Sequence, residues 1–218
     1  GDKGSIYSYN RKEWFGCYSA MQMINSTSVA VYHTSSSDEV EWIVGNSDSK
    51  IIFIGHNPND NGEEDKMPLV RLLSIIDKIE SLETIVLMGD DIKPINNDKI
   101  IRWDDFIARG LDVSYDDILD RMNSIEGDNT SSLIYTSGTT GNPKGVELTH
   151  NNFKVELDSV GDVLKFAQGD RYVSWLPLAH VFGQLVDNHY WVRRALHMSI
   201  VDSPLNTIDY AKEIQPHL

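Results

Sequence analysis

Cysteine and long apolar runs are both scarce in this sequence of 218 residues. Cys17 is the only cysteine, which excludes an internal disulfide framework and fits a reducing compartment. It lies in an apolar helical pattern, so we expect its thiol to be buried rather than reactive. No apolar run approaches the roughly 18–20 residues that a membrane-spanning helix requires, so we expect no helix that crosses a bilayer.

Positive charge is also in short supply. The sequence holds 19 Lys and Arg against 33 Asp and Glu, which gives a formal net charge of −14. Because nucleic-acid backbones are bound through Lys and Arg, this balance argues against a nucleic-acid partner. Acidic clusters such as Asp38–Glu39, Glu63–Asp65 and Asp116–Asp117 are typical of solvated faces or helix starts, and we do not expect them to hold a metal.

Short apolar runs alternate with helical patterns along the chain. Several runs are continuously apolar, as is typical of strands that are covered on both faces. We predict strands at Val29–Tyr32, Ile51–Gly55, Thr84–Gly89, Ser132–Gly138, Tyr172–Leu178 and Met198–Asp202. We predict helices around Trp14–Met21, after a Ser36–Glu39 capping box, and at Asp65–Ile79, Trp103–Phe106, Asn151–Lys165 and Val181–Leu196. This order predicts an α/β fold with a mostly parallel β-sheet and helices on both of its faces.

One loop, YTSGTTGNPKGVELTH from Tyr135 to His150, concentrates polar chemistry after an apolar strand. In an α/β sheet this placement is the carboxyl end of a strand, where ligands usually bind. Lys144 supplies a compact positive charge, neighbouring hydroxyls supply donors, and successive backbone N–H groups can form an anion-holding nest. Three glycines permit a positive φ and a close approach of backbone to ligand: Gly138, Gly141 and Gly145. The loop therefore predicts an oligophosphate site.

Two other interpretations of this loop fit the sequence less well. A flexible connector rich in Gly, Ser and Thr rarely follows a buried strand with Pro-Lys-Gly attached. A Walker-type phosphate loop requires G-x-x-x-x-G-K-[ST], whereas Lys144 follows Pro143 and precedes Gly145, so the hydroxyl that would bind magnesium is missing. The spacing therefore excludes a Walker-type kinase or ATPase.

The segment TSGTTGNPKGV, Thr136 to Val146, resembles the phosphate-loop motif of the adenylate-forming (AMP-binding) superfamily. Three further stretches resemble long-chain fatty acyl-CoA synthetases: Asn10–Trp14 (NRKEW), Val29–Val44 (VAVYHTSSSDEVEWIV) and Ser174–Gln184 (SWLPLAHVFGQ). His33 and Gly183 depart from the long-chain pattern, which commonly has Asp and Glu there. The resemblance implies that residues 1–218 are part of the large N-terminal AMP-binding domain, with the phosphate loop at 135–146 and the small C-terminal domain absent.

The resemblance also implies an activity for the whole protein, with ATP, Mg²⁺ and CoA as co-substrates. A fatty acid would be activated as an acyl-adenylate and transferred to CoA, and the chain alone would be inactive. It implies a cytoplasmic protein that can associate with the cytoplasmic face of a membrane. Two alternatives stay open: adenylation of another acid (medium-chain, aryl, or one loaded onto a carrier protein), or a non-catalytic nucleotide-binding homologue.

The resemblance also implies roles for individual residues. His180 and Lys144 would be catalytic, with His180 near the reacting carboxylate and phosphates, although a buried core histidine is the alternative. The resemblance assigns no metal ligand within the chain, and Trp175–Leu178 either approach the acyl site or form strand core. His150 follows Thr149, and a helix cap at Thr149 explains that pair as well as catalysis does. The residues implied to hold ATP phosphates are Thr136, Ser137, Gly138, Thr139, Thr140, Gly141, Lys144 and Gly145.

Overall fold

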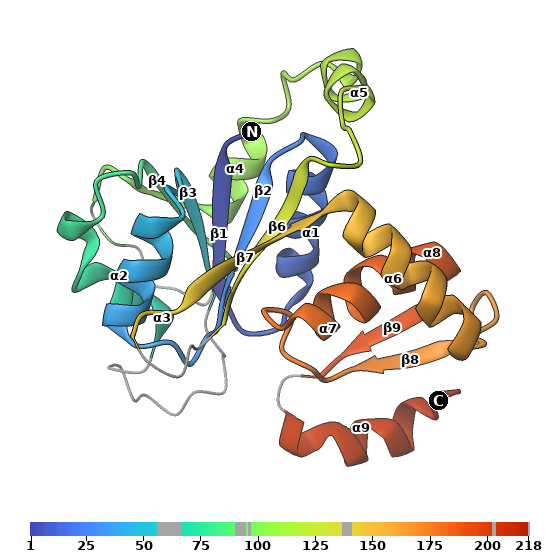
Figure 1. Cartoon of the computed structure of the whole chain (residues 1–218). Coiled ribbons are helices and arrows are strands. Elements are labelled where there is room, and N and C mark those ends of the chain that lie inside the picture. Colours follow the sequence, from blue (N-terminus) through green and yellow to red (C-terminus); the bar gives the residue numbers. More distant parts are fainter. Residues whose placement is uncertain (56–66, 90–94, 96, 137–140, 202–203, 218) are drawn as a thin grey trace.

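The computed structural model describes residues 1–55, 67–89, 95, 97–136, 141–201 and 204–217, and Figure 1 shows two sheets with their helices. The main sheet has seven strands in the order β5-β4-β3-β1-β2-β6-β7. Its strands are β1 (Lys3–Ser8), β2 (Thr27–Val31), β3 (Ile51–Gly55), β4 (Thr84–Leu87), β5 (Ile100–Arg102), β6 (Thr130–Thr136) and β7 (Lys144–Thr149). All neighbours pair in parallel except β6 and β7, which are antiparallel. The predicted α/β fold with a mostly parallel sheet is confirmed.

Two apolar cores lie on opposite faces of the main sheet, because side chains alternate along each strand. On one face, strand residues such as Tyr7 and Ile54 pack with α2 (Ser37–Asn46) and α3 (Pro68–Leu73). On the other face, Ile6 and Phe53 pack with α1 (Lys12–Met23) and α4 (Trp103–Ala108). This two-sided burial explains why the strand segments are continuously apolar in sequence.

The C-terminal elements lie to one side of the main sheet (Figure 1). Strands β8 (Arg171–Ser174) and β9 (His197–Ile200) pair in parallel as a separate two-stranded sheet. A continuous helical segment joins them through α7 (Val181–Gly183), the π-helix η3 (Gln184–Tyr190) and α8 (Trp191–Arg194). The remaining helices are α5 (Tyr115–Asn123), α6 (His150–Val163), α9 (Thr207–Ile214), and the 3₁₀ turns η2 (Ile76–Lys78) and η4 (Pro204–Asn206).

Helix starts follow the capping residues of the sequence. Ser36 accepts a hydrogen bond from the backbone N–H of Glu39, and the Glu39 carboxylate accepts from the N–H of Ser36, so the predicted capping box is present. The acidic pair Asp116–Asp117 lies in the first turn of α5, as expected for a helix start. The pair Asp38–Glu39 opens α2 in the same way. The third cluster, Glu63–Asp65, lies outside the described residues.

Several predicted elements are shorter than the sequence suggested. The predicted strand from Tyr172 to Leu178 ends at Ser174, and the predicted helix from Asp65 to Ile79 is reduced to α3 and η2. Pro68 occupies the first turn of α3, where its missing N–H costs nothing. Among the helices of the described ranges, none is long and apolar enough to cross a membrane.

Candidate active site

The carboxyl edge of the main sheet gathers the segments that resemble functional motifs. Because the strands from β1 to β6 run in parallel, their carboxyl ends meet at one edge. The registers pair Tyr7 with Val31 and Ala30 with Ile134, so Ser8 at the end of β1 is level with Thr136 at the end of β6. β1 and β6 are two strands apart, which separates their ends by about 10 Å.

The predicted phosphate loop joins β6 to β7, which pair as an antiparallel hairpin at the edge of the sheet. Thr136 is the last residue of β6 and is exposed, and it pairs across the hairpin with Lys144, the first residue of β7. Gly141 adopts a φ of +94°, so the predicted left-handed conformation is confirmed at this glycine. Four further predicted phosphate-binding residues lie outside the described residues: Ser137, Gly138, Thr139 and Thr140.

The structure corrects the extent of the loop. The sequence suggested a loop over 135–146, whereas Lys144 and Gly145 belong to β7, which returns antiparallel to β6. Gly145 needs no positive φ. A Cβ at Gly145 would lie 3.1 Å from the Tyr135 ring and 3.2 Å from Leu133 Cδ1. A Cβ at Gly145 would therefore crowd Leu133 and Tyr135, which is a packing reason for glycine here, and the predicted phosphate role of Gly145 stays a prediction.

Two side chains of α2 anchor the hairpin, and the sequence did not point to either of them. Trp42 Nε1 donates a 2.9 Å hydrogen bond to the carbonyl of Pro143. The hydroxyl of Tyr135 donates to Asn46 Oδ1 at 2.7 Å. The first contact joins residues 101 positions apart and the second joins residues 89 positions apart, so no local sequence pattern predicts them. They hold the base of the loop on the side of the sheet that α2 covers.

Lys144 is exposed beside the loop. Within the described ranges, no carboxylate lies at ion-pair distance from its ammonium group. A compact cation that is not neutralised by a neighbouring acid can bind an anionic group from solution. The backbone of Lys144 pairs with Thr136, so the position of its Cα is fixed by the sheet.

His180 caps the helical segment that follows β8. Its Nδ1 accepts a 3.2 Å hydrogen bond from the backbone N–H of Phe182. Because Nδ1 is the acceptor, the neutral ring carries its proton on Nε2. The side chain is exposed, so this imidazole is not the satisfied core histidine that was the alternative. Its Nε2–H is oriented by the cap and can donate to a ligand oxygen.

The segment before His180 is tied to the main sheet through Asn10, in the turn after β1. The Asn10 amide donates to the carbonyl of Leu176 at 2.7 Å, and its Oδ1 accepts from the N–H of Leu178 at 3.0 Å. These bonds bring the residues before His180 to the carboxyl edge that also carries the phosphate loop. Trp175 is 46% exposed while Leu178 is buried, so the segment from 175 to 178 divides between surface and core.

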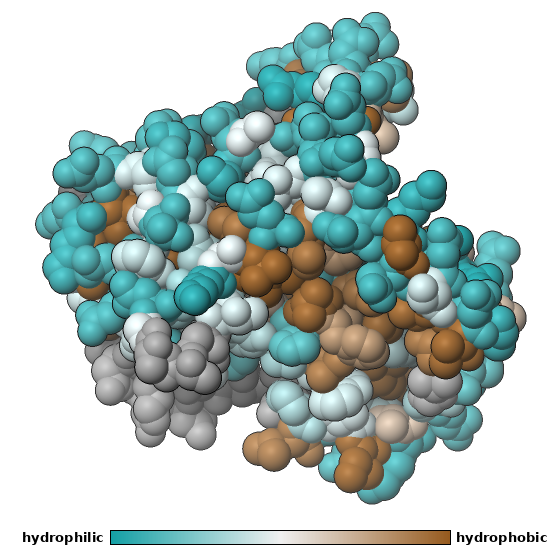
Figure 2. Space-filling view, viewed as in Figure 1, coloured by the Kyte–Doolittle hydropathy of each residue, from teal (hydrophilic) through white to brown (hydrophobic). Residues whose placement is uncertain are grey.

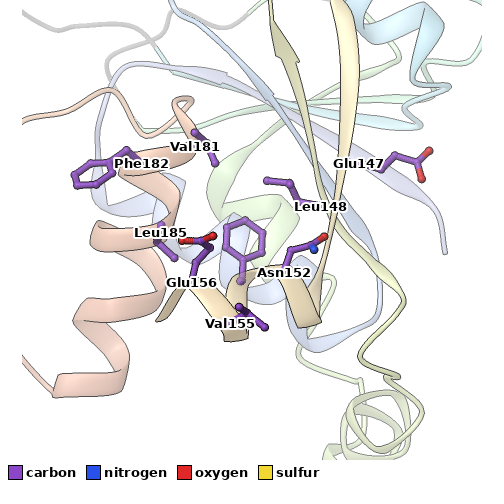
Figure 3. Close-up of a pocket in the computed structure, with 9 residues that line it drawn as sticks. Glu147, Leu148, Asn152, Val155, Glu156, Val181, Phe182 and Leu185 are labelled. Carbon is purple, nitrogen blue, oxygen red and sulfur yellow. The ribbon is translucent and has the colours of Figure 1, made fainter. Parts of the chain in front are cut away.

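A cavity of about 660 Å³ lies between β7, α6 and the helical segment that begins with α7 (Figure 3). Val181 and Phe182, which follow His180, form one wall, and Leu148 and Phe153 belong to the opposite side. Glu147 and Glu156 are its acidic lining residues. Figure 2 shows apolar surface gathered where the main sheet meets the C-terminal elements. A cavity of this size is typical of small-molecule sites.

The two departures from the long-chain pattern have distinct surroundings. His33 follows β2 at the carboxyl edge, where its ring lies 3.9 Å from that of Tyr9 and its carbonyl accepts from Arg71. Burial, with the nearby Arg71 charge, lowers the pKa of His33. A Cβ at Gly183 would lie 2.6 Å from the Pro177 carbonyl oxygen, so α7 packs directly on that backbone.

Polar groups buried along η3 were missed by the sequence interpretation. The carboxylate of Asp187 is fully buried and accepts hydrogen bonds from Tyr172 and from Ser174 Oγ, the latter at 2.5 Å. Burial raises its pKa from 3.8 to about 6, although both hydrogen bonds oppose this shift. His189 shares a 2.7 Å hydrogen bond with the Tyr18 hydroxyl, and burial lowers its pKa to about 4. The sequence signal was the run DNH inside an otherwise apolar helix.

His150 is the first residue of α6. Thr149 forms a capping box with Asn152, whose backbone N–H donates to Thr149 Oγ1 at 3.2 Å. The structure therefore gives the Thr149–His150 pair a capping role.

Comparison with known proteins gives the family. The model of the AMP-binding enzyme family matches residues 1–217. The chain belongs to the AMP-binding enzyme family. A long-chain-fatty-acid–CoA ligase of Xenopus laevis is 29% identical over 187 residues, which cover 84% of this chain and 24% of the relative. The peroxisomal long chain acyl-CoA synthetase 6 of Arabidopsis thaliana is also 29% identical, over 84% of this chain and 25% of the relative. The chain thus spans about a quarter of the length of these curated relatives.

Solved structures of AMP-binding enzymes share this fold. A red-emitting luciferase of Phrixothrix hirtus superposes with a TM-score of 0.72 at 18% identity, over 93% of this chain and 36% of the luciferase. ATP-bound MatB of Rhodopseudomonas palustris superposes with a TM-score of 0.67 at 17% identity, over 98% and 38%. The chain therefore shares the fold of the corresponding part of these structures.

The residues at the phosphate loop suit the phosphates of ATP. The left-handed Gly141, the exposed hydroxyl-bearing Thr136 and the cation of Lys144 lie at one hairpin tip. Together they offer donors and positive charge to an oligophosphate. In the part of the chain with defined coordinates, no three His, Cys, Asp or Glu side chains gather as metal ligands.

Proposed function

We propose that the whole protein carrying this chain is an ATP-dependent acyl-CoA ligase that acts on a long-chain fatty acid. A carboxylate oxygen of the acid attacks the α-phosphorus of ATP, the bond to the bridging oxygen breaks, and pyrophosphate leaves. The thiolate of CoA then attacks the acyl carbonyl and releases AMP. The observation that carries the proposal is the hairpin tip with Lys144, at the sheet edge that also holds the segment before His180.

Lys144 and the loop act on the leaving group in this proposal. Negative charge accumulates on the β- and γ-phosphates as the bond to the α-phosphate breaks. Donors and cations that are already in place stabilise that charge without reorganising. Lys144 is held by its pairing with Thr136, and Trp42 and Asn46 support the hairpin from α2. The loop would bind the two phosphates that leave as pyrophosphate, with Mg²⁺ as their counterion.

His180 acts at the reacting groups. Its Nδ1 is engaged by the N–H of Phe182, so the neutral ring presents an N–H donor at Nε2. That donor would orient a carboxylate or phosphate oxygen during the attack. The fold of the segment, tied to Asn10, sets the position from which the imidazole reaches the substrate.

The acyl group is proposed to be a long alkyl chain. Relatives named as long-chain-fatty-acid–CoA ligase and long chain acyl-CoA synthetase support this class. The cavity of about 660 Å³, with Phe153, Val181, Phe182 and Leu185 among its lining residues, provides an apolar environment against the helical segment that His180 caps. Burial of each methylene contributes about 0.8 kcal/mol, which favours a long chain over acetate.

The test is exchange of labelled pyrophosphate into ATP by the whole protein. We expect exchange with palmitate and much less with acetate or benzoate. Lys144→Ala should lower the exchange rate on the order of 100-fold, as expected for loss of one charge-stabilising group. Lys212→Ala, at an exposed surface ion pair of α9, serves as the matched control and should leave the rate unchanged.

The outcomes separate the open alternatives. Exchange with benzoate or a medium-chain acid instead of palmitate would retain adenylation and replace the substrate class. Adenylation without transfer to CoA would favour an acyl group loaded onto a carrier protein. No exchange with any carboxylate would refute the ligase and leave a nucleotide-binding homologue.

A further inference from the structure

Asn10 makes a two-point contact with a backbone more than 160 positions away. Its Nδ2 donates to the Leu176 carbonyl at 2.7 Å and its Oδ1 accepts from the Leu178 N–H at 3.0 Å. The carboxamide thus pairs with the backbone as a neighbouring strand would. A primary amide offers a donor and an acceptor side by side, and Ala offers neither. An ionised Asp keeps the acceptor but turns an oxygen toward the carbonyl of Leu176.

The position of Asn10 links this contact to the phosphate loop. β1 ends at Ser8, which is level with Thr136 across two strands, and Asn10 lies two residues further. Asn10 therefore lies just beyond the sheet edge to which the predicted phosphate loop is attached. Because the contact fixes the backbone of Leu176 and Leu178, it also limits where the next residues, which include His180, can lie relative to that loop.

The same turn is held from its other side by α7. The N–H of His180 donates to the Pro177 carbonyl at 2.9 Å, and Gly183 approaches this carbonyl so closely that a Cβ would lie 2.6 Å from it. The residues before His180 are thus enclosed between Asn10 and the first turn of α7. Both contacts are made to backbone atoms, so they fix the path of the chain directly.

We propose that Asn10 is a positioning residue that places His180 opposite the phosphate loop. The inference rests on the proposed adenylation chemistry, and it adds a residue outside the phosphate loop and outside the His180 segment. Asn10 does not touch substrate in this proposal; it acts through the backbone of Leu176 and Leu178. Misplacement of a reacting group by about 1 Å can cost up to about 100-fold in rate.

The kinetic test compares Asn10→Ala and Asn10→Asp with the wild-type whole protein in pyrophosphate exchange. We expect kcat to fall at least about 10-fold, with KM for ATP within about twofold, because the phosphate loop is anchored by α2 and not by Asn10. A protonated Asp restores both a donor and an acceptor. The ratio of Asn10→Asp to wild-type kcat should therefore rise as the pH is lowered from 8 toward about 4, where an ordinary aspartate takes up its proton.

The matched control is Asn97→Ala, which removes another side-chain amide that bonds a backbone N–H, here that of Lys99. Asn97 precedes β5 and so lies at the opposite, amino edge of the sheet. Its kinetics should equal those of the wild type. A rise in KM for ATP with unchanged kcat in both Asn10 variants would overturn the proposal, as would wild-type kinetics in both.

A second measurement does not depend on activity. In the 218-residue chain, hydrogen exchange of the Leu178 amide and the ring ¹⁵N shifts of His180 are recorded for the wild type and for Asn10→Ala. The His180 signals are assigned by their loss in His180→Gln. We expect faster exchange at Leu178 and a shift of the His180 ring signals away from the Nε2–H tautomer in the variant. Unchanged signals at both sites would overturn the positioning role, even if the wild-type protein shows no exchange of pyrophosphate and the proposed function itself fails.

Discussion

Two ionisable groups on η3, the buried Asp187 and the partly buried His189, should oppose each other in the pH dependence of stability. Asp187 is fully buried and its folded pKa is raised from 3.8 to about 6, whereas that of His189 is lowered from 6.5 to about 4. Burial is the main cause of both shifts, because it disfavours the charged form of each group. A change of one pKa unit corresponds to about 1.4 kcal/mol. Each group therefore changes the free energy of unfolding by about 3 kcal/mol across its window.

The two contributions have opposite signs over nearly the same pH range. Between about pH 4 and 6 the folded chain holds a proton on Asp187 that the unfolded chain has lost, so stability from this group falls as the pH rises. Between about pH 4 and 6.5 the unfolded chain holds a proton on His189 that the folded chain lacks, so stability from this group rises with pH. The two slopes nearly cancel in the wild-type chain.

Single substitutions remove the cancellation. Asp187→Asn keeps one of the two acceptor oxygens and removes the titration, so the stability of this variant relative to wild type should increase by about 3 kcal/mol from pH 4 to 7. His189→Gln should show the reverse, with its relative stability falling by about 3 kcal/mol over the same range. Urea unfolding at half-unit pH steps measures both differences. Curves for the variants that run parallel to that of the wild type would refute the assignment of these shifts.

Two further predictions concern the hairpin anchor and the single thiol. Trp42→Phe removes the hydrogen bond to the Pro143 carbonyl and should raise KM for ATP several-fold with a smaller change in kcat. The control Trp103→Phe on α4 should leave KM unchanged. Pyrophosphate exchange measures both variants, and equal KM values in the two would contradict the anchoring role of Trp42. Cys17 is 4% exposed and burial raises its pKa, so an aromatic disulfide reagent should modify it only at the rate of unfolding, accelerated by urea; rapid modification of the folded chain would show an accessible thiol.

The central part of the fold was predictable because burial on both faces leaves a clear sequence pattern. Strands such as β3 and β4 are continuously apolar, and the capping box at Ser36 marked the start of α2. β7 was missed because its residues, KGVELT, were assigned to the loop motif, and the strand is short and largely exposed at the edge of the sheet. β1 was missed because its small polar residues, Ser5 and Ser8, are buried without an apolar run to mark them.

The chemistry of the site was predictable and its placement was not. Gly141 adopts the expected left-handed conformation, and His180 is exposed with one ring nitrogen oriented, as the proposed role requires. Gly145 is predicted to approach a phosphate, and the structure adds a packing reason for glycine there, because a Cβ would crowd the Tyr135 ring. A glycine in a motif does not reveal which of these needs it meets, because both a positive φ and a close contact exclude a Cβ.

The residues that position the site lie far from it in the sequence. Trp42 holds the phosphate loop through Pro143, and Asn10 holds the chain before His180 through the backbone of Leu176 and Leu178. Because Trp42 and Asn10 act on different parts of the site, their loss should affect different kinetic parameters. Loss of the first should weaken ATP binding, and loss of the second should slow the chemical step. Such a division follows from the sheet itself: each strand brings its own loop to the shared edge, so each part of the reaction depends on a different long-range contact.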